Sequence, residues 1–200
     1  VLYDLARAFP CRAALRPGLE LQRETLLQIA CGNASRLERL YEANGQYRDL
    51  AEMVRVQIRL EGDRDTRARL LGRLGELSER ELSDPRGAID AFKRRLEDVP
   101  GDASSLEALD RLYEGTEQWR ELVGVLEQRR ENGVSPAERQ TLMRRQAAVL
   151  AAKLGDTSEA IDVWRAYRGE FGDTSEALNA LEVLYRDAQR WDDLAETYEA

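Results

Sequence analysis

The chain has no histidine among its 200 residues. Histidine is the commonest general base and metal ligand in proteins, and the usual serine and cysteine nucleophile arrangements depend on it. Acidic pairs such as Asp192-Asp193 have no histidine or glycine-rich loop beside them that would complete a catalytic dyad. We therefore predict that the chain is not an enzyme and has no catalytic, cofactor-binding or metal-binding residue.

Cysteine and long apolar runs are also scarce. Cys11 and Cys31 are the only cysteines and form no C-x-x-C pair, which makes a zinc site a poor interpretation. We interpret both as small packing residues in a reducing compartment and expect a cytoplasmic protein. No stretch approaches the ~18 consecutive apolar residues of a membrane-spanning helix, and the first residues lack the pattern of a secretion signal.

Basic residues are too few to balance the acidic ones, and the net charge is −8. Residues 1–100 carry 18 basic and 17 acidic groups, whereas residues 101–200 carry 12 and 21. Nucleic-acid binding depends on an excess of Lys and Arg, so we expect no nucleic-acid partner. Only Lys93 and Lys153 are lysines, and the bias toward Arg and Ala suggests a bacterial, GC-rich genome. A hydrophobic content of 42% with 34% charged residues is typical of a soluble folded chain.

The sequence does contain a 72-residue period (113 − 41 and 185 − 113). Two aromatic series mark it, Tyr41, Tyr113, Tyr185 and Tyr47, Trp119, Trp191. A fixed period indicates a repeat protein, in which each unit buries its apolar face against its neighbours. At their spacing we interpret these aromatics, together with Trp164, as interhelix core rather than a platform for stacking bases.

Within one period, apolar spacing and helix start and stop signals predict four helices. Asp84-Pro85, Ser104 with Glu107, and Ser135-Pro136 have the patterns of helix N-termini. The predicted helices span residues 34–43, 47–60, 65–82, 85–99, 105–115, 118–131, 136–154 and 158–171, followed by one that begins at 175 and a last one over 190–200.

The domain organisation predicted from this pattern has two parts. Residues 1–32 form an N-terminal helical pair, either a degenerate repeat or a cap, and residues 33–200 form the repeat array. Trp191, Leu194 and Tyr198 make one side of the last helix apolar, so we expect a following helix and a longer polypeptide. The predicted repeats are 33–62, 63–103, 104–133, 134–173 and a truncated 174–200.

These repeats resemble the tetratricopeptide repeat family, in which about 34 residues form two antiparallel helices. The resemblance rests on Leu74-Gly75, on Ala88 to Phe92 and on the closing Pro100. Leu37, Leu74, Leu109, Gln146 and Leu181 occupy equivalent positions, with steps of 37, 35, 37 and 35 that make a 72-residue double repeat. The resemblance implies an all-α fold, an α-solenoid of antiparallel helix pairs. Gln146 and Arg95 depart from the family pattern.

The resemblance also implies that the first helix of each pair lines a concave surface that binds a partner. The arginines among these positions could grip the carboxylates of an acidic peptide, but we favour the interpretation that they form a solvated helix face with i,i+4 ion pairs. The Lys and Asn set that grips a C-terminal carboxylate in some family members is absent. The candidate partner-binding residues are Arg39, Arg69, Arg73, Glu76, Glu107, Arg111, Arg144, Arg145 and Asn179.

The function predicted from the sequence is a non-catalytic protein–protein interaction scaffold. It would bind a peptide or helix of a partner protein, or space the subunits of a larger assembly. Two alternatives remain open at this point, an RNA-binding helical-repeat protein and a regulatory segment of a larger enzyme whose active site lies elsewhere.

Overall fold

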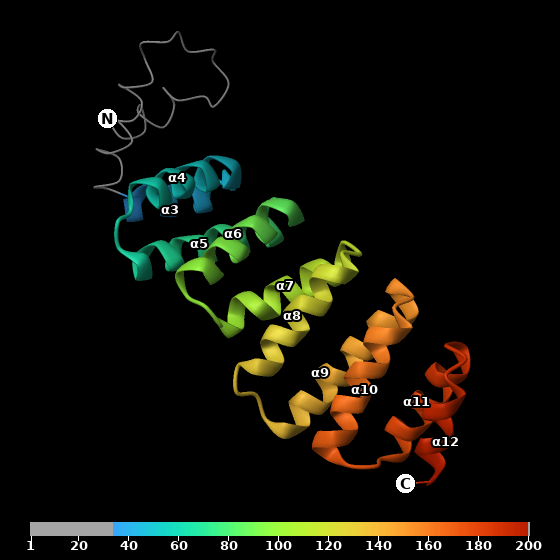
Figure 1. Cartoon of the computed structure of the whole chain (residues 1–200). Helices are drawn as coiled ribbons and strands as arrows, with labels where there is room; N and C mark the ends of the chain where they lie inside the picture. The colour runs from blue at the N-terminus through green and yellow to red at the C-terminus, as the bar shows by residue number, and fades with distance from the viewer. Residues whose placement is uncertain (1–33, 200) are drawn as a thin grey trace. The chain divides into compact units, whose positions relative to one another are not determined.

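The computed structural model describes residues 34–199, and every regular element in that range is an α-helix or a π-helical turn (Figure 1). The predicted helical pair in residues 1–32, with Cys11 and Cys31, lies outside the described residues. The chain divides into two compact units, the first ending at Asp98 and the second beginning at Val99. Among residues 34–199, no helix has the length and apolar composition needed to cross a bilayer.

The first unit contains two antiparallel helical hairpins. Each helix packs on the next along the chain, α3 on α4, α4 on α5 and α5 on α6. The bounds are α3 Ala34–Ala43, α4 Tyr47–Leu60, α5 Arg64–Arg80 and α6 Pro85–Asp98.

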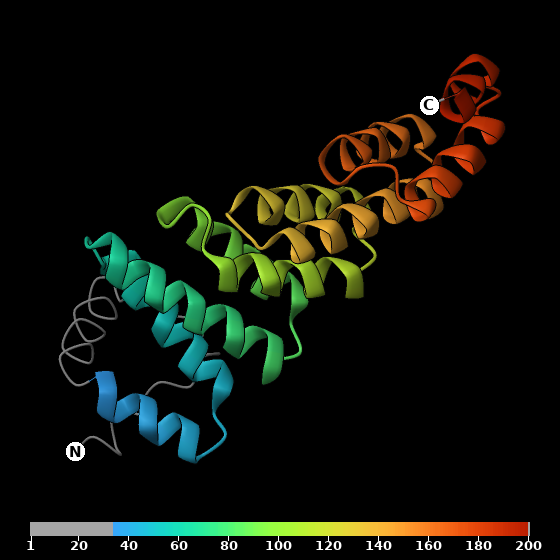
Figure 2. The same cartoon turned by 90° about the horizontal axis from the view of Figure 1, so that it is seen from below.

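The second unit contains three hairpins, and Figure 2 shows that its helices also follow one another in antiparallel pairs. The bounds are α7 Ala103–Gly115, α8 Trp119–Glu131, α9 Pro136–Val149, η1 Leu150–Leu154, α10 Thr157–Phe171, α11 Ser175–Asp187 and α12 Trp191–Glu199. The predicted all-α fold of stacked antiparallel helix pairs is confirmed. The exact limits of the individual repeats stay a prediction.

The 72-residue period is preserved in the helix starts. Tyr47, Trp119 and Trp191 are the first residues of α4, α8 and α12. Helices α5 and α9 begin at Arg64 and Pro136, and these starts are separated by the same interval (136 − 64 is 72). One of the two aromatic series of the sequence therefore supplies the first residue of the second helix in every odd-numbered hairpin.

Short polar side chains begin several helices as predicted. The Ser135 hydroxyl accepts a hydrogen bond from the Glu138 amide at 3.3 Å, with Pro136 in the first turn of α9. Asp84 accepts from the Gly87 amide at 3.0 Å, where proline again opens the helix. These side chains satisfy backbone N–H groups that have no partner within the helix.

Two predicted boundaries are wrong. The cap of α7 is Asp102, whose carboxylate accepts from the Ser105 amide at 2.8 Å, and Ser104 lies inside the helix with its hydroxyl donating to Asp102. The predicted single helix over residues 136–154 changes at Leu150 into the π-helical turn η1, which ends at Gly155 with φ +67°. The Asp156 amide donates to the Leu150 carbonyl at 2.9 Å and closes that turn. Glycine tolerates this left-handed conformation because it has no Cβ.

The core of the first unit lies between α4 and α5. Its apolar stripe recurs at helical spacing, and the close approach of α6 depends on Gly75, where a Cβ would lie 2.6 Å from the Phe92 ring. The leucine–glycine motif of the sequence thus marks the point where Phe92 packs directly on the backbone of α5. The α4 and α5 side chains of this core are Leu50, Met53, Val54, Ile58, Leu71, Leu74 and Leu77.

The core of the second unit also contains most of the predicted aromatic residues. Tyr113, Tyr185 and Trp164 are buried, which confirms the prediction for them, while Trp119 is half-buried. In the first unit Tyr41 and Tyr47 are half-buried and pack against the core. The fully buried aliphatic side chains include Leu106, Leu109, Leu122, Leu126, Leu150, Ile161 and Leu181.

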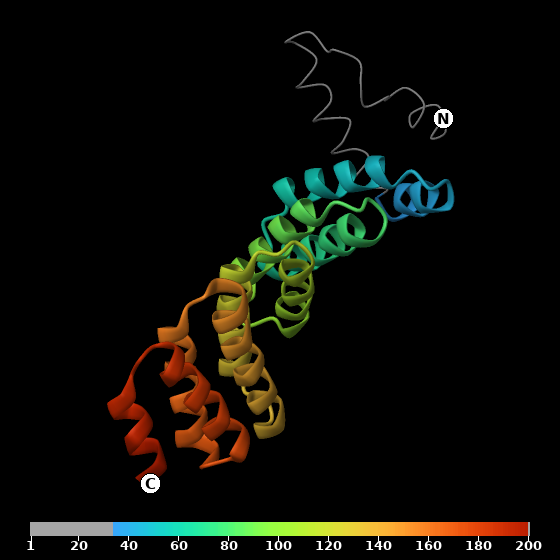
Figure 3. The same ribbon diagram turned by 90° about the vertical axis from the view of Figure 1, so that its right-hand side faces the viewer.

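The prediction is wrong for Trp191, which is 57% exposed. Helix α12 packs on α11, in the last hairpin shown in Figure 3, and its Asp193 forms an ion pair with Arg165 of α10. Its counterpart Trp119 differs because Lys153 of η1 lies over its ring. An aromatic at this position is covered only where a following helix supplies the cover.

Candidate functional site

The residues predicted to bind a partner all lie on the first helices of the hairpins. Four of them, Arg39 on α3 and Arg69, Arg73 and Glu76 on α5, belong to the first unit. The other five belong to the second unit, namely Glu107 and Arg111 on α7, Arg144 and Arg145 on α9 and Asn179 on α11. Their common use as a binding surface stays a prediction, but the structure shows what several of them contact.

In the first unit, Arg73 joins α5 to α3. Its guanidinium forms an ion pair with Glu38 through Nη1 and donates from Nη2 to Glu42 at 2.8 Å. Glu38 also accepts from the Gln57 amide at 3.3 Å. Burial lowers the pKa of Arg73, but the hydrogen bonds to Glu38 and Glu42 outweigh it and raise the pKa overall.

In the second unit, Arg145 makes the corresponding contacts between α9 and α7. It donates to Asp110 at 2.8 Å and to Glu114 at 2.7 Å. The Asp110 side chain is only 3% exposed and also forms an ion pair with Arg129 of α8. We call each of these arginines, together with the two acidic residues that it contacts on the preceding first helix, a clamp. The three residues of the second clamp lie one full period after those of the first (110 − 38, 114 − 42 and 145 − 73 are each 72).

A second ion pair repeats with the same period. Arg67 donates from Nε to Asp98 at 2.7 Å, and Arg139 pairs with Glu170 at 3.2 Å. The hydrogen bond from Arg67 holds the pKa of Asp98 below its usual value, against the opposing effect of desolvation. Arg144, next to the clamp residue, pairs with Glu176 at 3.1 Å. Arg73, Arg144 and Arg145 therefore hold neighbouring helices together within their units.

Sequence reasoning missed the acidic partners of these arginines. The signal was present, because Glu38 with Glu42 and Asp110 with Glu114 form i,i+4 acidic pairs at the same interval. On an isolated helix such pairs repel each other. Their repetition therefore indicated a cation from another helix.

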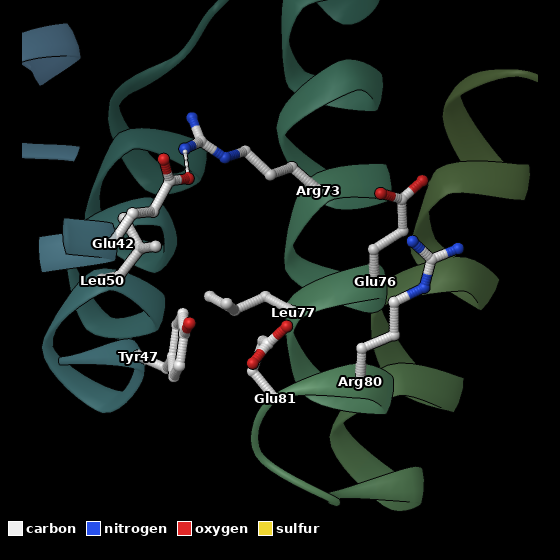
Figure 4. A pocket seen from close by; sticks show the side chains of 8 residues that line it. All are labelled: Glu42, Tyr47, Leu50, Arg73, Glu76, Leu77, Arg80 and Glu81. Carbon is white, nitrogen blue, oxygen red and sulfur yellow. Dashed lines mark hydrogen bonds and ion pairs between the residues drawn. The ribbon is translucent and has the colours of Figure 1, made fainter. Parts of the chain in front are cut away.

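The first unit also has an open pocket of about 380 Å³ between the α3–α4 turn and α5 (Figure 4). Leu50 and Leu77 form its buried apolar wall, and Tyr47 lies beside them. Of the predicted site residues, the fold brings Arg73 and Glu76 together here. The lining side chains are Glu42, Tyr47, Leu50, Arg73, Glu76, Leu77, Arg80 and Glu81.

The charges around this pocket fall into two groups. Glu42 and Arg73 are bonded to each other, as the dashed line in Figure 4 marks. The side chains of Glu76, Arg80 and Glu81 are exposed and form no hydrogen bond or ion pair with another described residue. The pocket thus has two carboxylates and one guanidinium that are available to a ligand. Residues 34–199 contain no group of three metal-binding side chains.

The stacked hairpins and their 72-residue double period define an all-α repeat protein of the solenoid class. The family model described as tetratricopeptide repeat matches residues 177–200, which include most of the α11–α12 hairpin. This match supports the resemblance predicted from the sequence.

The solved structures similar to this chain include several of the MamA protein. A crystal structure of MamA has 11% sequence identity and a TM-score of 0.47, covering 84% of this chain and 87% of that one. A structure described as MamA AMB-1 has 17% identity and a TM-score of 0.46, with coverage of 86% and 90%. No curated protein matches the chain.

Proposed function

We propose that this chain is a non-catalytic scaffold that binds a segment of another protein through the first helices of its hairpins. The observation that carries the proposal is the open pocket beside α5, where Glu76, Arg80 and Glu81 have no partner within the described chain. An extended repeat surface suits this role because its contact area grows with the number of repeats.

The repeated clamps support the proposal by holding the hairpins of each unit in one arrangement before a partner arrives. Arg73 and Arg145 each bridge two acidic side chains on a neighbouring first helix. Binding then orders fewer groups, and a preorganised surface loses less free energy on association. Substituting these two arginines would disturb the frame, so they are unsuitable for testing partner contact.

The pocket volume of about 380 Å³ is near the low end for small-molecule sites. Its charged rim and apolar wall resemble the polar edge and buried centre of a peptide-binding surface. The side chain of a bound peptide would enter the pocket, while the rest of the peptide would follow the exposed polar side of α5.

Selection of displayed random peptides on the immobilised chain tests this function. We expect enrichment of a defined peptide whose affinity falls at least about tenfold when Arg39 and Arg111 are both replaced by Glu. The matched control replaces Arg86 and Lys93, exposed on the second helix α6, by Glu and should leave the affinity unchanged. Thermal unfolding of both variants verifies that they are folded.

Two results would count against the scaffold. One is the failure of any peptide to be enriched above a blank surface. The other is salt-sensitive retention of single-stranded RNA in place of peptides, which would favour the RNA-binding alternative.

A further inference from the structure

In the second unit, the side chain of a lysine lies over the ring of the aromatic residue that begins α8. The Lys153 ammonium of η1 lies 4.9 Å from the centre of the Trp119 ring at the start of α8. A cation over an aromatic face is attracted by the negative charge of the π system. At this position the chain itself supplies the cation.

At the equivalent positions of the first unit the aromatic residue is retained, but the basic residue is replaced by an acidic one. Tyr47 takes the place of Trp119, and Glu81 takes the place of Lys153 (119 − 47 and 153 − 81 are both 72). Both Tyr47 and Glu81 line the open pocket. No described side chain places a cation over the Tyr47 ring, whereas Lys153 lies over Trp119 in the second unit.

A further exchange makes the open position more acidic. Glu76 lines the pocket where the second unit has Ala148 (148 − 76 is 72). Arg80, the one unpaired cation of the described rim, lies on the same helix. In Figure 4 Glu76 and Arg80 project from one side of the pocket, whereas Tyr47 and Glu81 lie near its other end. The unpaired carboxylates outnumber the unpaired guanidinium, so the local field favours a cation.

We propose that this pocket takes up one cationic side chain, arginine or lysine, of a partner protein. Its methylene stem would lie against Tyr47 and Leu77, its charged head would bind the carboxylate of Glu81, and Glu76 on the rim would add to the negative field that attracts it. Arginine suits the site better, because its planar guanidinium both stacks on an aromatic ring and grips carboxylates with paired hydrogen bonds. The proposal rests on the proposed scaffold function and specifies the chemistry of the partner.

The decisive probes are N-acetyl-arginine amide and its neutral isostere N-acetyl-citrulline amide, titrated into the whole chain and followed by NMR. We expect the arginine probe to shift the Tyr47 ring signals and the amides of Glu76 and Glu81 saturably, and the citrulline probe to leave them unchanged. Replacing Glu76→Gln with Glu81→Gln should weaken the arginine probe at least about tenfold. The control Asp90→Asn with Glu97→Gln, on positions of α6 outside the pocket, should bind it normally.

A second variant copies the closed arrangement of the second unit. Glu81→Lys places an ammonium at the position equivalent to Lys153 and should abolish binding of the arginine probe while leaving thermal unfolding unaltered. Conversely, Ala148→Glu with Lys153→Glu opens the equivalent position and should produce new binding with a change in Trp119 fluorescence. Equal binding of citrulline, or undiminished binding by Glu81→Lys, would overturn the proposal.

The outcomes for this pocket and for the scaffold are separable. Peptides enriched on the chain that lack basic residues and bind Glu76→Gln with Glu81→Gln normally would overturn the pocket assignment and leave the scaffold standing. Binding of the arginine probe without enrichment of any peptide would support the pocket and reject the scaffold.

Discussion

Arg145 on α9 donates a hydrogen bond of 2.8 Å to the buried carboxylate of Asp110 on α7. The pair Arg73 and Glu38 makes the same contact one period earlier in the chain. The sequence period therefore specifies charged contacts as well as apolar ones, and each contact joins the first helices of successive hairpins within a unit. These arginines join the first helices of successive hairpins, and their use in binding a partner stays a prediction.

The first prediction concerns Asp110. Its replacement by Ala leaves Arg129 and Arg145 without their buried counter-charge, and we expect a loss of about 2–3 kcal/mol in the free energy of unfolding. That range is below the full cost of breaking a buried pair because both arginines are partly exposed. Urea denaturation measures it.

The matched control is Glu114→Ala, which removes the other acid that Arg145 contacts. Glu114 is 57% exposed, so its loss should cost less than about 1 kcal/mol. Equal losses for Asp110→Ala and Glu114→Ala would show that burial does not govern the clamp.

The second prediction concerns Gly75 in α5. An added Cβ would lie 2.6 Å from the Phe92 ring, so Gly75→Ala should destabilise the chain by about 1–3 kcal/mol because the ring must move. Gly124 lies inside α8 and has nothing within 4 Å of an added Cβ. Gly124→Ala should therefore stabilise by up to about 1 kcal/mol through helix propensity. Thermal unfolding would contradict this account if both variants changed stability in the same direction.

The third prediction is a pH dependence from Asp98. The hydrogen bond from Arg67 lowers the pKa of Asp98 in the folded chain, so the pair contributes stability above the unfolded pKa of about 3.9 and loses it as pH falls through the folded pKa. The difference in unfolding free energy between the natural chain and Asp98→Asn should be constant from about pH 7 to 5 and shrink below about pH 4. Urea denaturation across this range measures it.

Arg67→Gln provides the check on this assignment. It removes the cause of the shifted pKa and should abolish the same pH-dependent difference. If Arg67→Gln retains the acid-dependent loss of the natural chain, the low pKa of Asp98 has another origin.

The fourth prediction contrasts two tryptophans. Trp164 is 8% exposed and Trp191 is 57% exposed. Trp164→Ala should cost about 3–5 kcal/mol, and Trp191→Ala less than about 1 kcal/mol. Acrylamide quenching of single-tryptophan variants measures the exposure directly, and equally weak quenching of both would contradict it.

Capping residues in the sequence predicted helix starts correctly where the side chain that begins the helix bonds to an amide of the same turn. Ser135-Pro136 and Asp84-Pro85 mark true helix starts because a cap satisfies amides within the next turn. Ser104 gave the wrong start because the carboxylate of Asp102, two residues earlier, caps the helix by accepting from the Ser105 amide. The π-helical turn at Leu150 was not predicted, because the apolar spacing continues through it without a break.

The candidate site was much less predictable. Positions on the first helices follow from the period, but whether an arginine there is available depends on what the next hairpin presents to it. Arg145 is a predicted partner-binding residue, and the structure shows that it contacts Asp110. The pocket beside Tyr47 joins residues from three helices, and no single helix pattern contains it.

The sequence by itself determined the helices, their pairing and their 72-residue period, because capping, apolar spacing and repetition act within one helix or between chain neighbours. Only the tertiary structure decided which charges are bonded to each other and which remain on the pocket rim. That distinction depends on distances between side chains of different helices, which are set by how the helices pack and are not encoded in any local stretch.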